Sequence, residues 1–184
     1  SYGDAVTLPA GWDQSVVRII RIDTDSGYQA TAYINDATKQ VHFANAGTND
    51  WRDVQSWPDL VFGPRSQQIT DMMIEANGLN ARLQTGGDLE GYSIATPGHS
   101  WGELESQILT YVFGWKGLGY DGPGAKPIID DPRFAQILQD LDITAVQGNN
   151  FISCNTAGVG PFGGGVVGSL VSDIEGTRKC TVTL

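Results

Sequence analysis

The stretch Gly98-His99-Ser100-Trp101-Gly102 decides the fold. It lies between a strand expected over residues 91–96 and a helix expected over residues 102–112, whose apolar residues recur at helical spacing. Flanking glycines remove the Cβ atoms that would collide in a sharp strand-to-helix turn. The helix that begins there directs N–H groups and partial positive charge toward the serine. This pattern predicts that the Ser100 hydroxyl stands exposed above a sheet, with the Trp101 N–H beside it.

Strands and helices follow one another on both sides of this turn. Ahead of it, β-branched or alternating runs predict strands over 16–22, 28–34 and 40–46, the last two joined as a hairpin, and amphipathic spacing predicts a helix over 64–83. After it, we expect strands at 118–120 and 143–146, a helix over 131–141 and a long loop over 148–168. The alternation predicts an α/β fold of α/β-hydrolase type: a central, mostly parallel sheet flanked by helices, with an antiparallel hairpin at its N-terminal side.

Length and charge narrow the function classes. The 184 residues fit one domain, expected to span 1–184, and the net charge of −10 disfavours nucleic acid as a partner. The sequence contains neither an apolar run long enough to cross a bilayer nor a signal-peptide pattern, so we expect a soluble and already processed protein. The acid excess is compatible with a secreted or salt-tolerant origin, and of these we expect secretion. Cys154 and Cys180 leave open one disulfide or two buried thiols.

Three segments resemble the class 3 lipases and their bacterial lipase-like relatives, an α/β-hydrolase family. They are Val41-His42-Phe43-Ala44-Asn45-Ala46-Gly47-Thr48 with the nearby Trp51-Arg52-Asp53, the turn around Ser100, and Gly119-Tyr120-Asp121-Gly122-Pro123-Gly124. The resemblance runs from about Gly11 to about Gly168. It implies a hydrolase of carboxylic esters or lipids in which Ser100 is the nucleophile, and Trp101 and Thr48 supply the oxyanion contacts. The substrate would be a small-molecule or lipid ester.

The sequence departs from this family at the acid and at the histidine of the triad. A serine nucleophile needs a base, and the two histidines are His42, within a predicted strand, and His99, next to Ser100. The segment 146–151, which resembles the acid-bearing segment, carries Asn149 and Asn150, and Gly165-Val166-Val167-Gly168 has valines where the family has histidine. Two hypotheses therefore stand: an ester hydrolase with an incomplete triad, or a catalytically inactive lipase-like module that binds a hydrophobic ligand or serves assembly, including homo-oligomers.

Acidic residues offer two weaker alternatives. Asp121, Asp130 and Asp131 are expected at the sheet edge that builds the site, where a carboxylate polarises a water or is simply solvated. We expect no cofactor. Calcium is the one metal that the sequence leaves open, through Asp23, Asp25, Asp50, Asp53 and Asp59, although their spacing fits no EF-hand loop.

Overall fold

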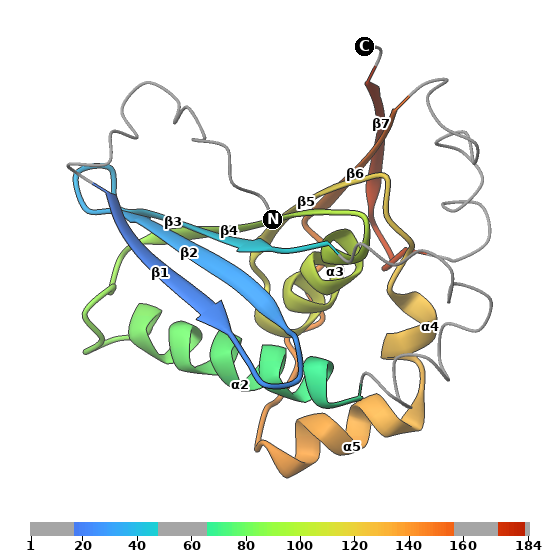
Figure 1. Ribbon diagram of the computed structural model, residues 1–184, viewed down its shortest axis with the longest axis horizontal. Helices are drawn as coiled ribbons and strands as arrows, with labels where there is room; N and C mark the ends of the chain where they lie inside the picture. Colours follow the sequence, from blue (N-terminus) through green and yellow to red (C-terminus); the bar gives the residue numbers. More distant parts are fainter. Residues whose placement is uncertain (1–16, 48–65, 157–172, 183–184) are drawn as a thin grey trace.

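A computed structural model describes residues 17–47, 66–156 and 173–182. Its strands form one sheet in the order β1-β2-β3-β4-β5-β6-β7, with bounds β1 Val17–Asp23, β2 Gln29–Asn35, β3 Gln40–Asn45, β4 Ser93–His99, β5 Lys116–Tyr120, β6 Phe151–Thr156 and β7 Arg178–Val182. The helices are α2 Ser66–Leu83, α3 Trp101–Phe113, α4 Lys126–Ile129 and α5 Pro132–Asp140. Figure 1 shows α2 and α3 on the same side of the sheet.

The sheet has the expected mixture of directions. β1, β2 and β3 pair antiparallel, and β3 through β7 pair parallel. Ser100 follows the carboxyl end of β4, the edge at which α/β folds build their sites. The predicted mostly parallel sheet with an N-terminal hairpin is therefore confirmed.

The C-terminal third differs from the prediction. Residues 143–146, predicted as a strand, form none, because the main chain there bonds to the end of α3 instead: the Val146 N–H donates to the Val112 carbonyl at 3.0 Å. The next strand is β6, inside the predicted loop 148–168. That part of the loop prediction is wrong, and the remainder, 157–168, lies outside the described residues.

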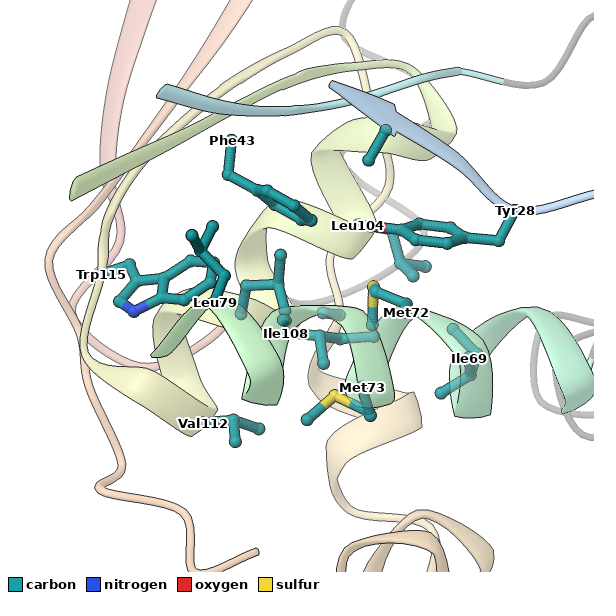
Figure 2. Close-up of a cluster of buried hydrophobic side chains, with 14 of the residues drawn as sticks. Tyr28, Phe43, Ile69, Met72, Met73, Leu79, Leu104, Ile108, Val112 and Trp115 are labelled. Carbon is teal, nitrogen blue, oxygen red and sulfur yellow. The ribbon is translucent and has the colours of Figure 1, made fainter. Parts of the chain in front are cut away.

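The main core lies between the sheet and helices α2 and α3. Figure 2 shows Phe43 of β3 and Tyr28, which directly precedes β2, pointing toward Met72 of α2 and toward Leu104 and Ile108 of α3. All of these side chains are 0–1% exposed. Burying an apolar side chain of this size contributes roughly 1.5–3 kcal/mol. This packing fixes α3, and with it the turn at Ser100, against the sheet.

A disulfide links the last strand, β7, to its neighbour β6. Cys154 of β6 and Cys180 of β7 face one another in register and form a disulfide with a Cα–Cα distance of 4.5 Å. Of the two alternatives that the sequence left open, the structure has the disulfide.

None of the helices in the described ranges is both long and apolar enough to cross a membrane.

Candidate functional site

Ser100 lies at a strained turn between β4 and α3. It is the N-cap of α3 with φ 59° and ψ −123°, in the left-handed half of the backbone map that residues other than glycine rarely occupy. Its N–H donates to the Tyr120 carbonyl of β5 at 2.8 Å, and its carbonyl accepts from the Glu103 N–H at 3.0 Å. The predicted strand–turn–helix context of the serine is confirmed.

The flanking glycines are required by close approach of main chain. A Cβ on Gly98 would lie 1.9 Å from the Gly102 carbonyl oxygen, and a Cβ on Gly102 would lie 2.5 Å from the Asn45 carbonyl oxygen. Gly47, at the end of the described part of that segment, would carry a Cβ 3.4 Å from the Ser100 Cβ. These contacts bring the end of β3 directly against the serine turn, as the sequence resemblance implies.

The expectation that the Ser100 hydroxyl stands exposed is wrong for this structure. Ser100 is 3% exposed, and Trp101, the first residue of α3, is 4% exposed. The Trp101 indole N–H donates to Glu105 Oε1 at 3.0 Å, so its side chain is held within the protein. Its main-chain N–H belongs to the first turn of α3, where helix geometry directs such groups out of the helix end. Thr48, the other expected oxyanion contributor, lies outside the described residues, as do Trp51, Arg52 and Asp53.

Neither histidine is placed as a base for Ser100. His42 is in the middle of β3, opposite Tyr33 and Ala95, three residues before the level of the turn, or about 10 Å along the strand. Burial lowers the pKa of His42. His99 is the last residue of β4 and its exposed side chain lines a surface cleft. The His99 side chain is exposed, whereas Ser100 is buried beyond the end of β4, so the two side chains have different surroundings.

The expected acid-bearing segment lies at the wrong edge of the sheet. Asn149 and Asn150 immediately precede β6, whereas Ser100 follows the carboxyl end of the parallel strand β4. The Gly148 N–H donates to the Tyr111 carbonyl at 2.9 Å, which ties this segment to the last turn of α3. These asparagines therefore do not correspond to a triad acid. The Gly165–Gly168 segment, where the family has its histidine, is outside the described residues.

The three loop aspartates have different surroundings. Asp121 follows β5, and its N–H donates to the Cys154 carbonyl at 2.9 Å, so it lies at the carboxyl edge as expected. Asp130 pairs with Lys126 at 2.6 Å, and Asp131 pairs with Arg133 at 2.8 Å and caps α5. Within the described ranges, no group of three or more His, Cys, Asp or Glu side chains is arranged to hold a metal ion.

A buried carboxyl one turn after Ser100 was not anticipated from the sequence. Glu103 is 0% exposed, and its Oε2 accepts the Gly122 N–H at 2.6 Å. Burial raises the pKa of Glu103 to about 7, although hydrogen bonds from Ser153 and from the Gly122 N–H oppose that rise. Gly119 makes room for it, since a Cβ there would lie 2.2 Å from the Glu103 Cγ.

Glu103 belongs to a polar cluster that links α3 to the C-terminal segment. Gln107 donates to Asp173 Oδ1 at 2.8 Å and accepts from the main-chain N–H groups of Ala125 at 3.1 Å and Ile174 at 3.2 Å. Lys179 of β7 pairs with Asp173 and donates to the Ser153 hydroxyl at 3.4 Å. A sequence signal existed: Glu103, Gln107 and Thr110 form a polar stripe at helical spacing on an otherwise apolar helix.

Comparisons with known proteins support the fold more than the family. No protein-family profile matches the chain. The chain is similar to an uncharacterized protein, RP165, of Rickettsia prowazekii (strain Madrid E), with 32% identity over 131 residues that cover 62% of this chain and 32% of that protein. The chain thus spans about a third of the length of this relative.

Solved structures of similar fold are fungal lipases. A fungal lipase–inhibitor complex, described as a basis for interfacial activation in lipases, superposes with a TM-score of 0.51 at 15% identity, covering 80% of this chain and 60% of that one. The native propeptide complex of Rhizomucor miehei lipase has a TM-score of 0.49 at 15% identity, covering 79% and 53%. The first similarity shows that this chain has a lipase-like α/β-hydrolase fold, and at such low identity it shows nothing finer.

Proposed function

We propose that this chain is a lipase-like serine ester hydrolase that acts on a carboxylic ester or lipid through Ser100. The observation that carries the proposal is the backbone of Ser100, with φ 59° and ψ −123° at the turn from β4 to α3. Such a conformation costs roughly 1–3 kcal/mol, and strained residues of this kind cluster at functional sites. Three closely packed glycines hold Ser100 in this conformation. This arrangement favours a functional role for the Ser100 hydroxyl over a purely structural role for the residue.

The proposed chemistry is acyl transfer. The Ser100 Oγ attacks the ester carbonyl carbon, the alcohol leaves, and water then hydrolyses the acyl-enzyme. The N–H groups of Trp101 and Thr48 are the proposed donors to the oxyanion, by resemblance to the class 3 lipases. Oxyanion stabilisation and substrate binding without a complete triad retain about 10³–10⁴-fold acceleration over water.

The second candidate is a catalytically inactive lipase-like module with a binding, structural or assembly role. Two observations favour it. The chain has only the histidines His42 and His99, and neither is placed to accept a proton from Ser100. Ser100 is also 3% exposed, so a substrate reaches its hydroxyl only after a local rearrangement. The proposed partners of such a module are a hydrophobic ligand or further copies of the chain.

Labelling with a fluorophosphonate separates the two candidates. We expect the probe to label the purified protein and a short-chain ester to be hydrolysed, and we expect Ser100→Ala to abolish both. Ser93→Ala is the matched control, because Ser93 is an exposed serine at the start of β4. No labelling and no turnover in either wild type or Ser100→Ala would assign the chain to the inactive module, and equal labelling and turnover in both would overturn the role of Ser100.

Secretion is part of the same proposal. The disulfide between Cys154 and Cys180 supports it, because disulfides persist in oxidising compartments. Mass spectrometry of the protein isolated from culture medium, without reduction, tests both the disulfide and the location.

A further inference from the structure

A cleft of about 590 Å³ opens beside the serine turn, across the ends of β1, β2 and β3. Its volume falls in the range of ligand sites, roughly 300–1,000 Å³. Small residues make the hollow: Ala44, Ala46 and Gly47 lie at the end of β3, between the larger Tyr33 and His99. The cleft therefore has an apolar floor and polar ends.

The inner end of the cleft lies next to the turn that carries the candidate nucleophile. Gly47 and His99 line it, and a Cβ on Gly47 would lie 3.4 Å from the Ser100 Cβ and 2.8 Å from the His99 carbonyl oxygen. A ligand in the cleft thus ends within one residue of Ser100. No part of the proposed reaction yet uses this space.

The outer end of the cleft carries one charge of each sign. Arg21 and Asp23 lie on the same face of β1, opposite Thr31 and Gln29 of β2. Two residues along a strand separate them by about 7 Å. In the ranges that the structure describes, no carboxylate pairs with Arg21, and Asp23 accepts a hydrogen bond from Gln29 at 3.3 Å. The two charges thus face the cleft without neutralising one another.

We propose that this cleft binds the zwitterionic head group of an amphiphilic ester. The anionic part of the head group pairs with the guanidinium of Arg21, and its cationic part pairs with the carboxylate of Asp23. The apolar body lies over Ala44 and Ala46 toward Ser100. A purely anionic head group meets repulsion from Asp23, and a neutral one leaves both charges unused.

The sheet sets the length of the ligand. From β1 to β4 there are three strand spacings, or about 14 Å. The head group at Arg21 and the ester at Ser100 are therefore separated by an apolar segment of about that length. The ester part of this inference rests on the proposed hydrolase function, whereas the head-group binding does not.

Three detergents with the same dodecyl chain test the head-group preference. Binding of dodecylphosphocholine, dodecyl sulfate and dodecyl maltoside is measured by titration calorimetry below their micelle concentrations. We expect the zwitterionic detergent to bind at least about fivefold more tightly than the other two, a difference of about 1 kcal/mol. Equal affinity for the three head groups would overturn the proposal.

Variants locate the binding. Arg21→Gln and Asp23→Asn are each expected to remove the preference for the zwitterionic detergent. Ala44→Leu is expected to lower the binding affinity for all three detergents at least tenfold, because the larger side chain fills the apolar floor of the cleft. Arg18→Gln is the control, because Arg18 lies on the same strand but pairs with Asp36 at 2.7 Å outside the cleft. Unchanged binding in Arg21→Gln and Asp23→Asn, with thermal unfolding showing both folded, would also overturn the proposal.

None of these detergents is a carboxylic ester, so their binding is independent of catalysis. We expect Ser100→Ala to bind dodecylphosphocholine as wild type does. Zwitterion binding in a protein that no fluorophosphonate labels would support the cleft and reject the hydrolase, and labelling without head-group preference would do the reverse.

Discussion

Replacing Gly98 with alanine is expected to destabilise the protein by at least about 3 kcal/mol, the upper range for overpacking a well-packed site. The added Cβ would lie 1.9 Å from the Gly102 carbonyl oxygen and 2.6 Å from the Ser106 Oγ. The Ser106 side chain can rotate away, but the Gly102 carbonyl belongs to the first turn of α3 and moves only with the helix. Since α3 is packed into the core through Leu104 and Ile108, that movement disrupts the core as well.

Gly78→Ala is the matched control for this substitution. Gly78 lies in α2 with an exposed face, and a Cβ there would meet nothing within 4 Å. Alanine in a helix interior is favoured over glycine by about 0.5–1 kcal/mol, so this variant is expected to be slightly more stable than wild type. Urea unfolding followed by circular dichroism measures both. A Gly98→Ala variant as stable as Gly78→Ala would contradict the packing of the turn.

The serine turn was predictable from sequence because its determinants are local. Gly98 and Gly102 bracket Ser100 within five residues, so the pattern is visible in one short segment. The close approach at Gly98 is to the Gly102 carbonyl within the turn, whereas the approach at Gly102 is to the Asn45 carbonyl of β3. The hairpin of β2 and β3 and the amphipathic helix α2 were predictable for the same reason, since alternation and helical spacing are properties of short segments.

The C-terminal part was not predictable because tertiary contacts decide it. Residues 143–146 are as strand-like locally as residues 151–156, but only the latter pair with β5 and β7. The former bond to the end of α3 through Val146. The error displaced the expected acid segment by one element, from the carboxyl edge of the sheet to the amino edge.

The cleft and the buried cluster also depend on what the sheet brings together. Arg21 and His99 are 78 positions apart in the sequence, yet they line one hollow because β1 and β4 are three strands apart in the sheet. Glu103 is buried only because Gly119 and Gly122, from the next strand and its loop, leave room for it. The polar stripe of Glu103, Gln107 and Thr110 is a local signal, but the residues that surround it and those that line the cleft come from distant parts of the sequence.

The buried carboxyl of Glu103 is expected to make the protein less stable as the pH rises from 5 to 8. The pKa of Glu103 is raised from 4.5 to about 7 by burial, so the folded state binds its proton more tightly than the unfolded state does. The stabilisation is fully present below about pH 4.5 and is lost as the pH rises through 7. At 1.36 kcal/mol per unit, the loss approaches about 3 kcal/mol.

Comparison of wild type with Glu103→Gln isolates this effect. The amide keeps an oxygen for the Gly122 N–H but does not titrate, so we expect its unfolding free energy to lack the decline, and to exceed that of wild type at pH 8. His42 contributes in the opposite direction, because burial lowers its pKa, and it contributes equally in both proteins. Glu75→Gln, at an exposed position of α2, is the control and should follow wild type. Parallel pH profiles for wild type and Glu103→Gln in urea unfolding would contradict this prediction. They would show that Lys179, Ser153 and the Gly122 N–H stabilise the buried Glu103 carboxylate, so that its charge does not destabilise the turn that carries Ser100.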